Sequence, residues 1–270
     1  MMGVLNLVVV MGYAMTTFLT IRWMIADSHQ RDTGTDRVIL STTVVATLHG
    51  ASLTPLLTGS TSPNLALGTT LSVIALIIVV LFLITSLRKP LTALGILVLP
   101  AAGLAALTGW VFPGPSYTPL VSSISALAHM LIACLAYGFL SLAVAQSLLL
   151  VTLEKLIRHR HPAGFLSNLP PMETMEGVLF QLINAGFVLL TITLISGGIF
   201  SEQLFGRALL LNHHATLAVL AWLSFAALIT GRRMFGWRSR TAVTWTLTSF
   251  ILLVLGYFGT RVVLEVILAS

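Results

Sequence analysis

Residues 65–87 read LALGTTLSVIALIIVVLFLITSL, and no charged residue interrupts this stretch. About 20 consecutive apolar residues are enough for a helix to cross the hydrocarbon core of a bilayer. Arg88 and Lys89 follow at once, as expected where a span meets the headgroup region. The stretch therefore predicts a transmembrane helix.

Similar stretches account for most of the chain. Apolar residues make up 57% of the 270 positions and charged residues 8%, with a mean hydropathy of +1.00. A soluble domain carries about 25% charged residues, so this composition excludes a sizeable soluble domain. We expect an all-α, polytopic helical bundle that forms one membrane domain over 1–270. The predicted spans are 3–21, 38–57, 65–87, 91–112, 120–150, 174–200, 210–231 and 242–265.

Basic residues alternate from one side of these spans to the other. Twelve of the 14 lysines and arginines precede the second, fourth, sixth or eighth span. The positive-inside rule puts those loops in the cytoplasm and both termini outside. The same placement argues against a nucleic-acid partner in spite of the net charge of +6, because the cations face lipid headgroups. The twelve are Arg22, Arg31, Arg37, Arg88, Lys89, Lys155, Arg158, Arg160, Arg232, Arg233, Arg238 and Arg240.

Four of the seven histidines fall within predicted spans, where a buried polar group is costly and marks a candidate site. His129 in the fifth span shares a helical face with Ser125, Ala133 and Ala136. A flat tetrapyrrole could lie on such a face. Close helix packing, with His129 hydrogen-bonded to a neighbour, explains the same pattern.

Of these four histidines, His213 and His214 lie in the seventh span and His49 lies in the second. His213 and His214 point about 100° apart on a helix, and we favour His214 as the inward one because Ala218 and Ala221 share its face. An interfacial polar cap is the alternative. His49 is a candidate second ligand, a proton-relay group or a hydrogen-bonded core histidine.

Haem is the cofactor that this set of donors favours. Two imidazoles from different helices can ligate haem iron on opposite faces, which makes His129 and His214 candidate ligands of the metal through haem. A closed site for a bare metal ion needs more ligands, and carboxylates are scarce inside the spans. Cys134 is the only cysteine, and no aspartate falls in a span, so we expect neither dithiol chemistry nor a Ser/His/Asp centre. We therefore expect no enzyme.

From about residue 115 the chain resembles the membrane cytochrome c assembly family typified by CcsA and CcmC, most of all its shorter YpjD/HemX-like branch. The resemblance is strongest over 115–265, within a haem-handling-like region of 38–270. It implies binding of haem b, as a bound ligand or cargo, through His129 and one of His213 and His214, with His49 as a second, deeper site. The segments that carry it are Leu127–His129 with Leu135–Tyr137, Leu169–Glu176 with Ala185–Thr191 and Ser196–Gly198, and Ala215–Trp222 with Gly236–Arg240.

One departure from the family limits the expected role. Members of the synthetase type carry a tryptophan-rich segment between the helices that correspond to the sixth and seventh spans. Here the predicted loop over 201–208 reads SEQLFGRA, without tryptophan. We expect an accessory in cytochrome c biogenesis or haem handling, located in a bacterial inner membrane, with haem, the lipid bilayer and other assembly proteins as partners. The alternatives are a small-molecule or ion transporter and a non-catalytic partner of a tetrapyrrole-synthesis enzyme.

Overall fold

A computed structural model describes residues 2–25, 31–58, 67–88, 91–112, 124–158, 169–205 and 213–259. Eight helices in this part of the chain are long and apolar enough to cross a membrane, which confirms the predicted all-α class and the eight spans. Backbone N–H and C=O groups must be bonded internally in hydrocarbon, and a helix satisfies them within one segment. The chain divides into two compact units, one of Met1–Tyr117 with Thr152–Met175 and one of Thr118–Val151 with Glu176–Ser270.

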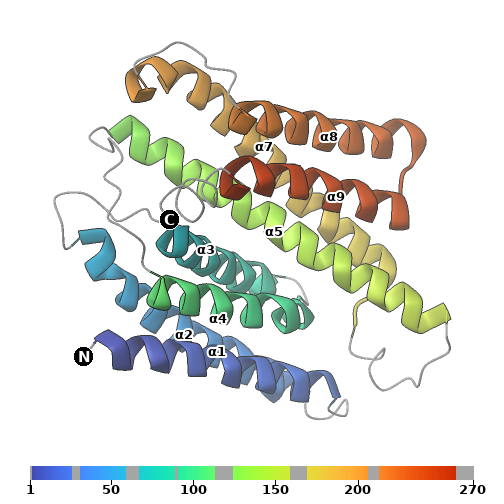
Figure 1. Cartoon of the computed structure of the whole chain (residues 1–270). Helices are drawn as coiled ribbons and strands as arrows, with labels where there is room; N and C mark the ends of the chain where they lie inside the picture. The colour runs from blue at the N-terminus through green and yellow to red at the C-terminus, as the bar shows by residue number, and fades with distance from the viewer. Residues whose placement is uncertain are drawn as a thin grey trace. The chain divides into compact units, whose positions relative to one another are not determined.

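The first unit is built from four long helices, among which α1 packs on α2 and α4, and α3 packs on the same two (Figure 1). Small residues allow these helices to approach closely, as is common in membranes. A Cβ atom on Gly109 would lie 2.8 Å from the Cβ of Ser72, and one on Gly12 would lie 2.7 Å from a methyl of Val45. Pro100 lies inside α4, as predicted. The elements are α1 (Met2–Ile25), α2 (Arg31–Thr58), α3 (Leu67–Arg88), η2 (Thr92–Leu94) and α4 (Gly95–Val111).

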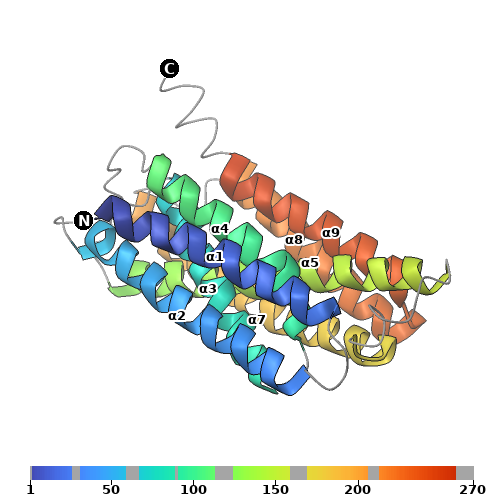
Figure 2. The same ribbon diagram turned by 90° about the horizontal axis from the view of Figure 1, so that it is seen from below.

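The second unit contains most of α5 and α7, together with α8 and α9, which lie side by side (Figures 1 and 2). Helix α9 ends in a single π-helical turn, η3. Helices α7 and α8 are joined where Trp222 donates a hydrogen bond from Nε1 to Oγ1 of Thr191, at 2.9 Å, and stacks on Phe187. The bounds are α5 (Ile124–Arg158), α7 (Met172–Phe205), α8 (His213–Phe235), α9 (Ser239–Val254) and η3 (Leu255–Gly259).

Several helices extend beyond their predicted ends. Lys155 and Arg158 were predicted in a loop but lie in the last turn of α5, and Arg232 and Arg233 lie in the last turn of α8. Cations near a helix C-terminus interact favourably with the helix dipole, and their long side chains reach the headgroup region from there. Likewise, α7 continues through Phe205 into the predicted loop 201–208, whose remainder lies outside the described residues. The sidedness of the termini stays a prediction.

Candidate functional site

His129 lies on α5 in the second unit, where a serine of α7 fixes its imidazole. Its Nδ1 atom is 2.8 Å from Oγ of Ser196. The Ser196 hydroxyl also lies 3.1 Å from the carbonyl oxygen of Thr193, to which it can donate its single proton. In that arrangement Oγ accepts a bond from Nδ1–H, so the unprotonated nitrogen of the neutral ring is Nε2. An imidazole in this tautomer has the lone pair that binds a metal.

The neighbouring residue, Gly197, keeps space open beside this ring. A Cβ atom at Gly197 would lie 3.3 Å from Cε1 of His129, tighter than an ordinary contact between carbon atoms. The first two residues of the sequence Ser196-Gly197-Gly198 therefore act on the imidazole of His129. The serine orients the imidazole, and the glycine next to it leaves room on one of its edges.

His214 lies in the first turn of α8, in the same unit as His129. Its ring centroid is 6.0 Å from that of Tyr257, with the planes at 60°, and the residue is exposed. Gly256 brings the backbone of η3 close, because a Cβ there would lie 3.7 Å from Nδ1 of His214. His129 on α5 and His214 on α8 thus belong to the same unit. Their role as a pair of ligands stays a prediction.

His213 is the first residue of α8, and its side chain lies outside the described residues. The choice between His213 and His214 stays a prediction. The ring contact with Tyr257 gives His214 a defined place against η3.

An aromatic cluster links α5 to the end of α9. Tyr137, two helical turns beyond His129, donates a hydrogen bond from its hydroxyl to the carbonyl oxygen of Leu253, at 2.9 Å. Its ring lies 6.1 Å from that of Tyr257 and 6.2 Å from that of Phe258. Tyr257 and Phe258 belong to the π-helical turn, and turns of this kind occur frequently at functional sites. The sequence analysis did not predict either residue as part of the site. The pattern Gly256-Tyr257-Phe258-Gly259, two aromatic residues between two glycines, could have indicated an irregular turn there.

His49 occupies the interior of the first unit and uses both ring nitrogens. Nδ1 lies 2.9 Å from the hydroxyl of Tyr13, and Nε2 lies 2.8 Å from Oγ of Ser72. The side chain is only 1% exposed. This geometry is that of a hydrogen-bonded core histidine, since ligation of a metal would require one of the two bonds to break. The prediction of a second haem ligand at His49 stays a prediction.

Three residues of the segments that carry the family resemblance lie at helix ends and not at the histidine site. They are Glu176, Trp237 and Arg238. Glu176 at the start of α7 forms an ion pair with Arg238, at 3.2 Å, and accepts a hydrogen bond from the backbone N–H of Ser239. It thereby satisfies an N–H at the start of α9. Trp237 stacks on Trp245. Twenty residues of α7 separate Glu176 from Ser196, a helical rise of about 30 Å.

The donors in the second unit fit haem better than a bare metal ion. Within the described ranges, no group of three or more His, Cys, Asp and Glu side chains could hold a metal ion. Cys134 is a free, buried thiol. Haem iron needs only two axial ligands from the protein, and imidazoles on two helices can supply them.

These features define a polytopic α-helical membrane protein in which one unit contains two histidines on different helices. Over residues 4–268 the chain matches the family described as Cytochrome C assembly protein, and it belongs to that family.

Curated relatives agree with this assignment over different lengths. The inner membrane protein YpjD of Escherichia coli is 27% identical, over 98% of this chain and 100% of its own length. Protein HemX of Brevibacillus brevis is 22% identical over 54% of each chain. The cytochrome c biogenesis protein CcsA of Nostoc punctiforme is 32% identical over 32% of this chain and 25% of its own. No solved structure matches. With its eight apolar helices, the chain is a multi-pass inner-membrane protein.

Proposed function

We propose that the second unit binds haem b and that the protein serves as an accessory in cytochrome c biogenesis or haem handling, not as an enzyme. The observation that carries this proposal is the placement of His129, whose Nδ1 is held by Ser196 in the same unit as His214. The names of the relatives HemX and CcsA, the second of them a cytochrome c biogenesis protein, support the same general role.

His129 would use Nε2 as one axial ligand, and His214, or its neighbour His213, would supply the other. Haem, when bound, offers an iron that accepts an imidazole nitrogen on each face. Ser196 holds one imidazole in the tautomer that can donate its lone pair. Gly197 leaves the edge of that imidazole uncovered, and Gly256 leaves η3 close to His214. Tyr137 bonds to the last turn of α9, next to the π-helical turn whose Tyr257 lies against the imidazole of His214.

An accessory role fits this chain better than that of a synthetase. The segment over 201–208 has no tryptophan, so a tryptophan platform of the synthetase kind has no residues here to build it. The first five positions of the segment continue helix α7. Haem would therefore be a ligand or cargo of the histidine pair. Other cytochrome c assembly proteins are the partners that we propose to receive or supply it.

Absorption spectroscopy of the purified protein tests this proposal. We expect a Soret band after expression with ample haem, and its loss or a strong reduction in His129→Ala and His214→Ala. His213→Ala reports which residue of the adjacent pair binds. His49→Ala reports separately whether the histidine of the first unit contributes a second ligand. Absence of a Soret band in the wild-type protein would overturn haem binding, and a spectrum indifferent to His129→Ala and His214→Ala would overturn the ligands.

We also infer from the distribution of basic residues that both termini face away from the cytoplasm. Fusions of a reporter that is active on only one side of the membrane test this arrangement at each terminus. Activity of a cytoplasm-specific reporter at either end would contradict it. The result is independent of haem binding.

A further inference from the structure

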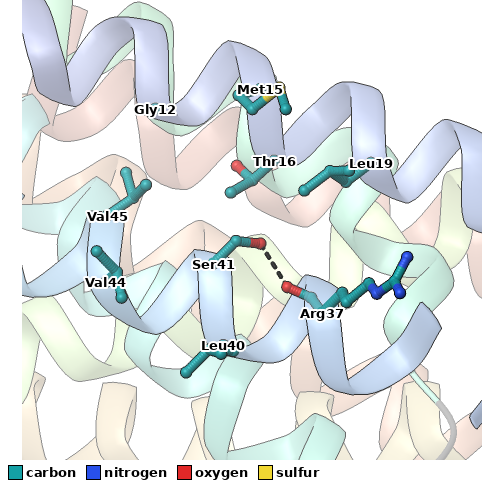
Figure 3. A pocket seen from close by; sticks show the side chains of 9 residues that line it. All are labelled: Gly12, Met15, Thr16, Leu19, Arg37, Leu40, Ser41, Val44 and Val45. Atoms are coloured by element: carbon teal, nitrogen blue, oxygen red, sulfur yellow. Dashed lines mark hydrogen bonds between the residues drawn. The ribbon is translucent and has the colours of Figure 1, made fainter. Parts of the chain in front are cut away.

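A groove of about 450 Å³ runs between α1 and α2 (Figure 3). It belongs to the first unit, whereas the histidines of the proposed haem site belong to the second. Its walls are mainly apolar and come from both helices. Leu40 and Val44 of α2 are 67% and 52% exposed, and Met15 of α1 is 56% exposed. The groove is therefore open on the side that a membrane protein turns towards lipid.

The two ends of the groove differ. At one end Gly12 meets Val45 so closely that a Cβ on the glycine would lie 2.7 Å from a valine methyl. At the other end lies Arg37, the one charged residue of the lining, and Figure 3 shows its guanidinium at the end of the groove remote from Gly12. Eight residues separate Arg37 from Val45, which corresponds to about 12 Å along α2.

The Arg37 end is also the end that meets the membrane surface. Trp23 near the end of α1 donates a hydrogen bond from Nε1 to Oγ1 of Thr35, at 3.0 Å. Tryptophan favours the level of the lipid headgroups, where one side of the ring is apolar and its N–H is polar. Arg22 lies in the last turn of α1 beside it. Two cations and a tryptophan thus mark one interface, and the apolar groove runs from there towards the bilayer centre.

Arg37 has charge available for a ligand. Among the residues that the structure describes, its guanidinium forms no ion pair. The Ser41 hydroxyl donates to the backbone carbonyl oxygen of Arg37, at 2.7 Å, and not to its guanidinium (Figure 3). An anion near this position would gain a charge-assisted hydrogen bond.

We propose that the α1–α2 groove is a selective site for an anionic phospholipid, with one acyl chain along the apolar walls and the phosphate on Arg37. One cation at the membrane surface matches one lipid phosphate, and the apolar walls beyond it match one acyl chain. The order of features, a cation at the interface followed by an apolar track, is that of a phospholipid.

Native mass spectrometry of the purified full chain tests the site, with phosphatidylglycerol and phosphatidylcholine as probes. We expect wild-type protein to retain phosphatidylglycerol in preference, and Arg37→Gln to lower that preference several-fold. Arg233→Gln is the matched control, because Arg233 is an exposed arginine in the last turn of α8. An equal effect of both variants would overturn the proposal, since it would indicate unspecific surface attraction only.

A second pair of variants tests the acyl-chain part. Val44→Phe fills the groove and should lower retention of phosphatidylglycerol several-fold, whereas Leu104→Phe, at a position of α4 that is 66% exposed, should not. Unchanged retention in Val44→Phe would overturn the placement of the chain. A dimer of the wild-type protein that Val44→Phe dissociates, with lipid retention unaffected, would instead assign the groove to a second copy and overturn the proposal. None of these readouts depends on haem.

Discussion

The Nδ1 atom of His129 lies 2.8 Å from Oγ of Ser196, a bond that joins α5 to α7 across 67 positions of the sequence. Because the Ser196 hydroxyl can donate to the Thr193 carbonyl, this bond selects the tautomer of His129 with a free lone pair on Nε2. A single hydroxyl thus sets both the direction of the ring and its capacity as a ligand. This relationship makes Ser196 a positioning residue of the proposed haem site.

Ser196→Ala should weaken haem binding without removing the ligand. Loss of a hydrogen bond that orients a metal-ligating histidine typically costs about 10- to 100-fold in affinity. We expect a decrease of that order in haem titrations, together with a shifted Soret maximum. Thr193→Val is the matched control, because it deletes a hydroxyl one turn away that bonds only to the backbone of its own helix. Equal affinities for wild type and Ser196→Ala would show that Ser196 does not position the ligand.

Tyr13→Phe should destabilise the first unit. The substitution leaves Nδ1 of His49 buried without its partner, and an unsatisfied buried polar group costs about 1–3 kcal/mol. Hydrogen bonds in membrane proteins average about 0.6 kcal/mol, so the expected loss lies towards the lower end of that range. Thermal or denaturant unfolding in detergent measures it. Ser52→Ala is the control, because Ser52 is also buried but bonds to a backbone carbonyl of its own helix.

A double-mutant cycle of Tyr13→Phe with Ser72→Ala extends this test. Both hydroxyls contact the same imidazole, so their effects should be non-additive. Strict additivity would contradict the view that Tyr13, His49 and Ser72 act as one hydrogen-bonded group. The haem content of His49→Ala, measured in the same preparations, decides independently whether His49 is a second ligand.

Glu176→Ala should lower stability more than Glu154→Ala does. Glu176 is nearly buried, pairs with Arg238 and accepts a hydrogen bond at the start of α9, and loss of such a helix cap costs about 0.5–2 kcal/mol. Glu154 pairs with Arg158 within one exposed helix end, and such pairs contribute about 0.3–0.5 kcal/mol. Unfolding midpoints of the two variants give the comparison. Equal midpoints would mean that the cap contributes no more than a surface pair.

The sequence was sufficient for the number of helices but not for the partners of the histidines. An uninterrupted apolar stretch such as 65–87 has one stable form in hydrocarbon, so eight of them predict eight helices. Helix ends were less predictable, because basic residues such as Lys155 and Arg232 occur both in loops and in the last turn of a helix. The contacts His129–Ser196 and His214–Tyr257 depend on how distant helices pack. Local periodicity contains no information on that register.

Two adjacent glycines of α7 offer a sharper test of the His129 site. Gly197→Ala would place a Cβ 3.3 Å from Cε1 of His129, whereas a Cβ on Gly198 would meet nothing within 4 Å. Both substitutions gain about 0.8–1.0 kcal/mol of helix propensity, so propensity cancels between them. We expect Gly198→Ala to retain the Soret band and the haem affinity of the wild type. Gly197→Ala should shift the band and weaken haem binding.

The comparison separates a displaced ligand from a perturbed helix. The bond from Nδ1 to Ser196 fixes one side of the His129 ring, and the new methyl of Gly197→Ala would contact Cε1. A movement of a few tenths of an ångström at His129 would therefore strain that bond. Circular dichroism should show the same helix content for both variants, because both place an alanine in the same helix. If Gly197→Ala and Gly198→Ala showed identical haem titrations, the ring of His129 would not be in contact with haem in the proposed way.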